Sequence, residues 1–309
     1  MAVDNTYSAV ISIYNKKDYI RRSLSSVLNQ ELSVNEVILV DDGSTDNWEK
    51  EVEDLLEDPR VRVVYQKNSG VSVARNRGAR ESKSEFVCFL DADDEWLSNF
   101  IFEIDRLISV APNASAFTVR HSRVSVDGKI QKQKISLPDG FCGVVENFLD
   151  EYRKGYGLIH SSCICIRREV FDSYEGFPPG ARKSQDIYFW LQLGLHETMA
   201  FNNTECVLRH DDGSGAALRA GVISHHIKYY LVDGHIKNVS NPHLHKFIKS
   251  NALIMMLAEK NSGNYDNAKI IQRSTKALGL TYFIKSYLLF CFPKKALSLG
   301  RKAQLFLRK

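Results

Sequence analysis

The 309-residue sequence lacks the features that mark several large classes of protein. It has no low-complexity tract and no internal repeat, which excludes disordered and repeat architectures. It contains six cysteines, but no Cys-x-x-Cys pair and no spacing of Cys and His suited to zinc. Because most of these cysteines lie in apolar runs, we expect buried thiols in a reducing compartment.

Targeting signals and long hydrophobic runs are missing as well. No basic segment followed by an apolar one opens the sequence, so we expect no secretion signal. The most apolar late stretch, residues 278–292, is shorter than the ~20 residues that span a bilayer, and Lys285 interrupts it. We therefore expect a cytoplasmic protein without a membrane span.

Acidic residues are absent from residues 267–309, which contain ten Lys and Arg. The whole chain has a formal charge of +4, so residues 1–266 carry −6. An acidic body argues against nucleic-acid binding by the main domain. The basic C-terminal region, interleaved with Leu, Tyr and Phe, suits peripheral contact with the inner face of the cytoplasmic membrane. A helical pair with a solvated basic face would explain the same pattern.

Two common nucleotide-binding motifs are also absent. There is no Gly-x-Gly-x-x-Gly after the first predicted strand and no Gly-x-x-x-x-Gly-Lys-Ser/Thr anywhere. Dinucleotide oxidoreductases and P-loop enzymes are therefore excluded. A nucleotidyltransferase is disfavoured, because no glycine-rich loop with an arginine follows the first strand.

The first ninety residues alternate short β-rich runs with helical patterns, which is typical of parallel βαβ units. Four strands are predicted, at residues 8–13, 37–40, 61–65 and 86–90. The length allows one large core with an appendage. We expect an α/β catalytic domain at residues 1–218 and a helical, basic region at residues 219–309.

Each predicted strand is followed by a polar cluster. The clusters are Tyr14-Asn15, Asp41 to Ser44, Asn68 to Gly70, and Asp91 to Asp94. In open α/β sheets, ligands bind beyond the carboxyl ends of the strands. We therefore expect the four clusters to converge on one cleft.

The last of these clusters places four carboxylates within five residues, from Asp91 to Glu95. Such crowding is unfavourable unless a cation or a helix N-terminus compensates it. A helix that starts at Asp94 or Ser98 and runs to about Ile108 would explain Asp94 and Glu95. Asp91 and Asp93 directly follow an apolar strand and can aim oxygens at Mg²⁺ or Mn²⁺. We predict a metal site at Asp91-Ala92-Asp93 and assign Asp94 and Glu95 mostly to the helix.

The two middle clusters each allow two interpretations. Asp41-Asp42 could form a turn and a helix cap, or could accept hydrogen bonds from a uracil imide and a ribose hydroxyl. In the run from Asn68 to Gly78, Gly70 allows close backbone approach, and Arg75 and Arg77 flank Asn76 on a helix of small residues. A surface helix with solvated arginines is the alternative.

In their order and spacing, these motifs resemble the family 2 glycosyltransferases of the GT-A fold. The matching segments are residues 11–15, 40–46, 68–78 and 89–94. The resemblance is clear over residues 7–110 and weaker to about residue 215. It implies a single Rossmann-like nucleotide-binding domain with a mixed sheet, followed here by a helical extension. Ser12 departs from the proline that the family often has, a residue that shapes the loop rather than doing chemistry.

The resemblance also implies roles for individual residues. Tyr14 and Asp41 would hold the base of the donor nucleotide. Asp42, Asn68 and Arg75 would support the nucleoside and diphosphate, and Asp91 would contact the ribose. Asp93 would coordinate Mn²⁺ or Mg²⁺. His210 lies where family members often close over the diphosphate, and it is a second candidate metal ligand, although a lone histidine is as often structural.

A candidate catalytic base lies beyond a further predicted strand at residues 162–166. The family carries an acidic pair at a helix start, and Asp186 matches its second member, whereas Gln185 replaces the usual Glu. Transfer with inversion needs a carboxylate that takes the proton of the acceptor hydroxyl, while a metal neutralises the departing diphosphate. The helix dipole alone could also favour an acid there.

The sequence thus predicts an inverting, metal-dependent glycosyltransferase that moves a hexose or acetamidohexose from a nucleotide-diphosphate sugar. We expect a UDP-sugar as donor and a saccharide or lipid-linked saccharide as acceptor, in cell-surface polysaccharide synthesis. A competing interpretation is a nucleotide-sugar-binding module of the same fold without turnover, which Gln185 keeps open.

Overall fold

A computed structural model describes residues 5–155, 157–211 and 221–291. The chain divides into two compact units. The first comprises Met1–Gly180 and Phe189–Ser214, and the second comprises Ala181–Tyr188 and Gly215–Lys309. The sequence placed one boundary at residue 218, whereas the second unit also includes residues 181–188.

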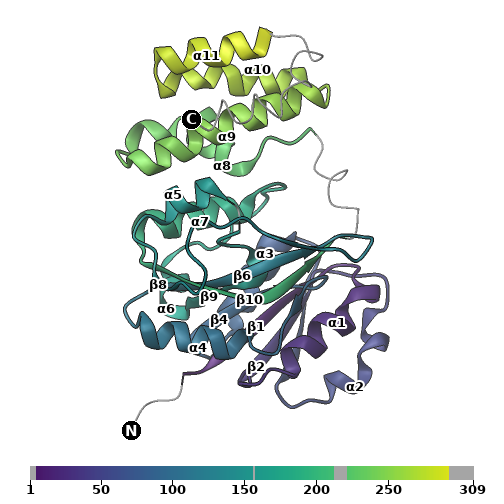
Figure 1. Cartoon of the computed structure of the whole chain (residues 1–309). Coiled ribbons are helices and arrows are strands. Elements are labelled where there is room, and N and C mark those ends of the chain that lie inside the picture. The colour runs from purple at the N-terminus through teal and green to yellow at the C-terminus, as the bar shows by residue number, and fades with distance from the viewer. Residues whose placement is uncertain (1–4, 156, 212–220, 292–309) are drawn as a thin grey trace. The chain divides into compact units, whose positions relative to one another are not determined.

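Ten strands form one mixed sheet in the described part of the first unit (Figure 1). Their order is β3-β2-β1-β4-β9-β6-β10-β5, with β7 beside β6 and β8 beside β10. The strands are β1 (Tyr7–Ile13), β2 (Glu36–Asp41), β3 (Val61–Tyr65), β4 (Phe86–Asp91), β5 (Glu95–Trp96), β6 (Ala116–Val124), β7 (Ile130–Lys132), β8 (Cys142–Val144), β9 (Ile164–Arg167) and β10 (Met199–His210). β1 to β4 pair in parallel, and β9 pairs antiparallel with both β4 and β6.

The four N-terminal strands predicted from the sequence are confirmed, within one or two residues at their ends. Their register aligns the carboxyl ends, because Ile13 pairs with Asp41 and Asp41 pairs with Tyr65. On the other side of β1, Ser12 pairs with Asp91. The polar clusters therefore begin along one edge of the sheet.

Helices cover both faces of the parallel strands, as expected for a sheet with apolar residues on both faces. One face of β1, with Ala9, Ile11 and Ile13, shares a core with α1 (Lys17–Leu28) and α4 (Phe100–Val110). The opposite face receives α3 (Val71–Glu81). A Cβ on Gly78 of α3 would stand 2.3 Å from Val10 Cγ1, so only glycine permits this close approach. The other helices of this unit are α2 (Glu53–Leu56), α5 (Phe148–Lys154), α6 (Arg168–Ser173) and most of α7 (Gln185–His196).

Two local predictions are wrong in part. Of the two helix starts considered, Asp94 is wrong, because Glu95 lies in β5 and pairs with Leu208 of β10, whereas α4 begins at Phe100, two residues after Ser98. The strand predicted at residues 162–166 begins at Ile164, because Ser161–Cys163 form a 3₁₀ turn.

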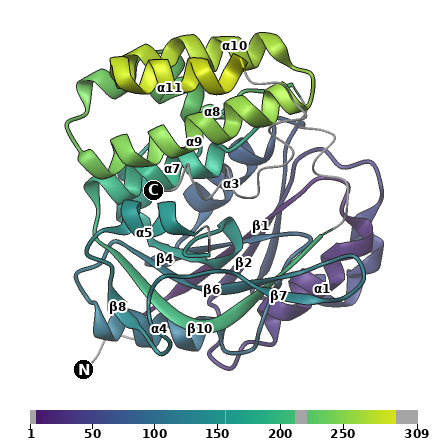
Figure 2. The same ribbon diagram turned by 45° about the horizontal axis from the view of Figure 1, so that its top comes forward.

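The described part of the second unit is helical. The helices α9 (Pro242–Asn261), α10 (Tyr265–Ser274) and α11 (Leu280–Cys291) pack side by side, preceded by the short α8 (His225–Ile227) (Figures 1 and 2). Among the helices that the structure describes, none combines the length and apolarity needed to cross a bilayer. The basic residues Arg301, Lys302, Arg308 and Lys309, on which the predicted membrane contact partly depended, lie outside the described residues.

Candidate active site

The loops after β1 and β2 are joined to each other. Asn15 adopts a left-handed conformation with φ 51°, and its side-chain oxygen accepts a hydrogen bond from the N–H of Thr45 at 2.8 Å. The N–H of Asn15 donates to Ser44 Oγ at 3.0 Å. Asparagine tolerates this backbone conformation better than most residues. The turn leaves Tyr14 half exposed at the sheet edge, where its ring can meet a ligand.

Asp41 and Asp42 are both buried, and they organise different loops. Asp41 accepts from the N–H of Ser44 at 2.9 Å, closing its own turn. Asp42 accepts from the N–H groups of Ser69 and Gly70, each at 2.8 Å, and from the side chain of Gln66 at 2.7 Å. Asp42 thereby fixes the backbone of the Asn68-to-Gly70 loop, a positioning role that the sequence interpretation did not assign.

Arg75 is not a solvated surface arginine. It is 5% exposed and forms an ion pair with Asp91, which links α3 to the end of β4. Its guanidinium also lies over the ring of Phe177, 5.1 Å from the centroid. Its Nε and Nη1 find no hydrogen-bond partner among the described residues. Buried unsatisfied donors of this kind are rare, and each calls for an explanation such as a functional role.

The neighbouring Asn76 anchors a different loop. Its side chain accepts from the N–H of Phe177 at 2.8 Å and donates to the carbonyl of Phe177 at 2.7 Å. Gly176 lies so close that a Cβ there would stand 2.5 Å from Asn76 Oδ1. One turn of α3 therefore holds both Asp91 and the Gly176–Phe177 segment.

Asp93 faces a different set of partners. Its carboxylate accepts from Lys16 Nζ at 2.5 Å, and its carbonyl accepts from the guanidinium of Arg22. Asp93 and His210 both line a cavity of about 310 Å³ between α1, the β6–β7 turn and the end of β10. Tyr19, Arg22 and Asp211 contribute to the same wall.

His210 is held at the end of β10 by two acids. The backbone N–H of His210 donates to Asp94 Oδ1 at 3.0 Å, and the ring Nε2 of His210 lies 3.2 Å from Glu95 Oε2. Burial, and then the charge of Arg22, lower the pKa of His210 below its ordinary value. A neutral imidazole is the form that binds metal ions, so the predicted role of His210 is chemically consistent but stays a prediction.

Asp94 has a larger structural role than the helix start assigned to it. The carboxyl group is almost completely buried, and it accepts from Ser162 Oγ at 2.5 Å as well as from His210. Burial, and then the charges of Asp91 and Asp93, raise its pKa to about 7. Nearby Arg209 acts in the opposite direction. Asp94 thus ties β4, β10 and the Ser161–Cys163 turn together.

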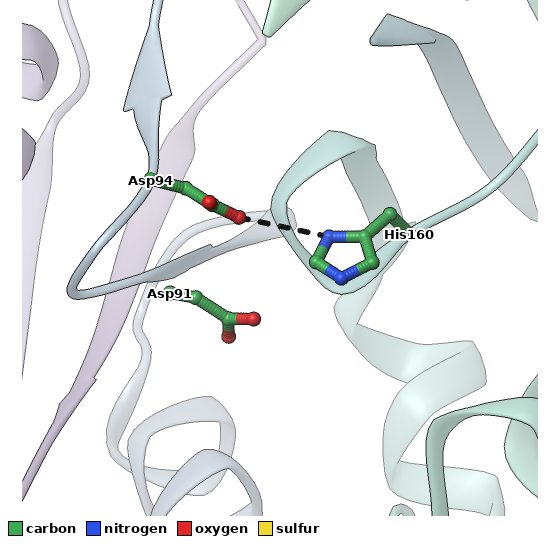
Figure 3. Close-up of side chains that lie close together, drawn as sticks. All are labelled: Asp91, Asp94 and His160. Atoms are coloured by element: carbon green, nitrogen blue, oxygen red, sulfur yellow. Dashed lines mark ion pairs between the residues drawn. The ribbon is translucent and has the colours of Figure 1, made fainter. Parts of the chain in front are cut away.

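The structure places a third group beside these carboxylates. Single ligand atoms of Asp91, Asp94 and His160 lie within 4.8 Å of one another (Figure 3). His160 Nδ1 is 3.7 Å from Asp94 Oδ2, too far for a hydrogen bond. That nitrogen accepts from the N–H of Ser162 at 3.2 Å. His160 therefore orders the turn, and the carboxylates are the better cation ligands.

The fit to a divalent cation depends mainly on Asp94. Lys16 neutralises Asp93 and Arg75 neutralises Asp91, so side chains relieve part of the crowding that suggested a metal. Within the part of the chain that the structure describes, His160 is the one basic side chain at salt-bridge distance from Asp94. Carboxylate oxygens beside an imidazole suit Mn²⁺ or Mg²⁺, and a cation would favour the ionised form of Asp94. The residues present are compatible with the predicted metal.

The predicted residues fall into two groups by location. Tyr14, Asp41, Asp42, Asn68, Arg75, Asp91, Asp93 and His210 all belong to the first unit. Asn68 lies exposed in the loop that Asp42 fixes. Asp186 belongs to the second unit, in the first turn of α7, where it accepts from the N–H of Ile187 at 2.9 Å. The strand ends lie in register, but convergence of the four clusters on one cleft stays a prediction, because the described cavity involves Asp93 and His210 alone among these residues.

Comparison with known proteins decides the family. Residues 8–174, more than half of the chain, match the sequence family described as "Glycosyl transferase family 2". The chain belongs to glycosyltransferase family 2. It is 30% identical over 209 residues to a Bacillus subtilis protein described as "Putative teichuronic acid biosynthesis glycosyltransferase TuaG", covering 66% of this chain and 77% of that relative. It is 41% identical over 92 residues to the uncharacterised glycosyltransferase YibD of Escherichia coli, covering 29% of this chain and 27% of the relative.

A solved structure agrees with this assignment. The fold is similar to that of Staphylococcus aureus TarS 1-349 in complex with UDP-GlcNAc, with a TM-score of 0.65 and 18% identity. The similarity covers 96% of this chain and 92% of that one. The α/β domain is therefore of the GT-A type with C-terminal helices, as the resemblance implied.

Proposed function

We propose that the protein is an inverting glycosyltransferase that uses a nucleotide-diphosphate sugar, preferably a UDP-sugar. The acceptor is a saccharide or lipid-linked saccharide in cell-surface polysaccharide synthesis. One observation carries the proposal: in a family 2 chain, acidic strand ends and a buried arginine are locked together at one sheet edge. The relative named for teichuronic acid biosynthesis and the solved complex with UDP-GlcNAc support the choice of acceptor and donor classes.

In this proposal the donor meets groups whose positions are already fixed. Tyr14 and Asp41 hold the base, and Asp91 holds the ribose. Asp42 acts through the backbone of the Asn68-to-Gly70 loop, which it fixes by two N–H bonds. Arg75 balances Asp91 and offers positive charge to the diphosphate. Groups oriented before binding lose little entropy when the ligand arrives.

The proposed cofactor is Mn²⁺ or Mg²⁺. Asp93 and His210 face one cavity, while Asp91 and Asp94 lie together beside His160. Asp93, Asp94 and His210 would hold the cation, whereas Asp91 is left to the ribose. A bound divalent cation would neutralise negative charge on the diphosphate leaving group.

Asp186 is the proposed general base. The transfer forms a bond from the acceptor oxygen to the anomeric carbon and breaks the bond from that carbon to the diphosphate oxygen. The hydroxyl proton passes to the carboxylate of Asp186. Attack on the side opposite the leaving group inverts the anomeric centre. General-base catalysis of this kind contributes about 10²–10⁴-fold to the rate.

Asp186→Asn tests this role. We expect sugar transfer to fall about 10²–10⁴-fold, with the affinity for UDP near its original value, because the amide cannot take the proton. Asp266→Asn is the matched control, since Asp266 also lies in the first helical turn of a helix in the second unit. That variant should keep full activity. Undiminished transfer by the Asp186 variant would refute the base assignment.

Two measurements on the wild type separate an enzyme from a nucleotide-sugar-binding module, the interpretation that Gln185 keeps open. A module would show metal-dependent stabilisation by a nucleotide sugar but no transfer in the wild type. Thermal unfolding with UDP-, GDP- and dTDP-sugars, with and without Mn²⁺, measures the first property. Stabilisation by GDP- or dTDP-sugars alone would overturn the choice of UDP.

A further inference from the structure

The two units carry opposite net charges. The second unit contains 18 Lys and Arg against 4 Asp and Glu, a formal charge of +14. The first unit must therefore carry −10, because the whole chain carries +4. Charge of one sign on one unit creates a field that selects an oppositely charged partner for that unit.

The helix α11 exposes one apolar stripe, although its other large apolar residues, Tyr282, Phe283, Leu289 and Phe290, are partly buried. Four large apolar side chains face solvent at positions i, i+4, i+7 and i+8: Leu280, Ile284, Tyr287 and Leu288 are 73%, 50%, 52% and 55% exposed. The residue of α11 that is fully buried is Ser286, whose hydroxyl lies 2.7 Å from that of Thr275. A surface helix normally buries its apolar stripe, so this stripe is available to a partner.

The charges around this stripe indicate which partner it fits. Lys269, Arg273, Lys276 and Lys285 are all exposed, and no acid occurs from residue 267 to residue 291. The following sequence, residues 292–309, adds six Lys and Arg and again no acid. On α9 and α10 the acids are Glu259, which is buried against Lys183, and Asp266. A second copy would bring like charges together, whereas an anionic lipid surface satisfies both the apolar stripe and the bases.

We propose that the exposed stripe of α11 and its basic surroundings form a docking surface for anionic lipid membranes. The helix lies in the interfacial plane, with Leu280, Ile284, Tyr287 and Leu288 in the acyl boundary and the lysines at the phosphate level. Apolar contact and electrostatic attraction are both needed, because neither a single short helix nor a basic patch anchors a protein firmly. This proposal does not depend on the assignment of the active site.

Flotation of the full chain with vesicles tests the surface. Vesicles of phosphatidylcholine mixed with phosphatidylglycerol are compared with vesicles of phosphatidylcholine alone, at low and high salt. The test variant is Ile284→Asn with Leu288→Asn. The control is Phe102→Asn with Val110→Asn on α4, where the two side chains are 50% and 55% exposed, matching the tested pair. Thermal unfolding of each variant checks that it is folded.

We expect the full chain to float with anionic vesicles, weakly with neutral ones, and less at high salt. The α11 variant should bind vesicles about tenfold more weakly, because Ile284 and Leu288 together lose at least that much affinity when they no longer bury apolar surface in the membrane. The α4 variant should bind like the wild type. Equal binding by both variants, or no flotation with anionic vesicles, would overturn the proposal. Self-association of the full chain that the α11 variant abolishes, without vesicle binding, would instead assign the stripe to a second copy.

Discussion

The two units of this chain use charge in opposite ways. In the first unit, acids and bases are mixed, and several are buried in pairs or networks, as at Arg75–Asp91 and around Asp94. In the described part of the second unit, exposed charge is mostly basic, and α11 exposes an apolar stripe. Buried pairs resist salt because water and ions do not reach them, whereas exposed charges of one sign act over a Debye length. This contrast supports our two proposals, a nucleotide-sugar site in the first unit and a membrane-docking surface on the second.

Removing a buried charge from the first unit should have the largest effect on stability. Arg75→Met leaves Asp91 without its partner and is expected to lower the free energy of unfolding by about 3 kcal/mol. It should also weaken UDP binding. Thermal and urea unfolding measure the first effect, and nucleotide titration measures the second. Arg21→Met is the control, because the Arg21–Asp54 pair is exposed and should matter by less than about 1 kcal/mol. Equal losses of stability in the Arg75 and Arg21 variants would contradict the prediction that the buried pair matters more than the exposed one.

A smaller effect should appear in the pH dependence of stability. The pKa of Asp94 is raised to about 7, so the folded state holds a proton more tightly than the unfolded chain. This contribution to stability is fully present below the ordinary pKa of Asp, near 4, and is lost as the pH rises through about 7. In metal-free buffer, Asp94→Asn should remove this slope and raise stability at pH 8 by about 2 kcal/mol. It should also weaken stabilisation by Mn²⁺.

Thermal unfolding between pH 5 and 8 measures the slope. Asp54→Asn is the control, because a hydrogen bond from Arg21 lowers the pKa of exposed Asp54, which therefore stays ionised throughout this window. Parallel profiles for the wild type and the Asp94 variant would contradict the prediction. They would mean that burial of Asp94 is compensated by its hydrogen bonds.

The smallest effect is expected in the second unit, at the polar side of α11. Ser286→Ala removes a buried hydroxyl that bonds Thr275, and should lower stability by about 1 kcal/mol. Vesicle binding should be unchanged, because Ser286 lies on the face opposite the apolar stripe. Ser274→Ala, which removes an exposed hydroxyl bonded within its own helix, should have almost no effect. Loss of vesicle binding in the Ser286 variant would show that the two faces of α11 are not independent.

The sequence was sufficient for features that depend on local pattern. Short β-rich runs that alternate with helical patterns located β1 to β4. The polar residues that follow these strands pointed to a site at the strand ends. Asp94 was misassigned because its partners, Ser162 and His210, are 68 and 116 residues away. The β5–β10 pairing that draws Glu95 away from a helix start is equally remote in sequence. Local pattern carries no information about such contacts.

The same limit applies to the parts of the site that the sequence did not reveal. Lys16 was not foreseen as the partner of Asp93, nor His160 as the neighbour of Asp94. Each is a single polar residue in a loop or at a helix start, without a periodic signal. The apolar residues of α11 were visible in the sequence, but it did not reveal that one stripe of them is exposed while Ser286 is buried.

The adjacency of Arg75 and Asn76 has a mechanical consequence. Arg75 pairs with Asp91 at the end of β4, and Asn76 makes two hydrogen bonds to the backbone of Phe177. The guanidinium of Arg75 also rests on Phe177. Helix α3 therefore couples the end of β4 directly to the Gly176–Phe177 segment, so that a movement of one should shift the other.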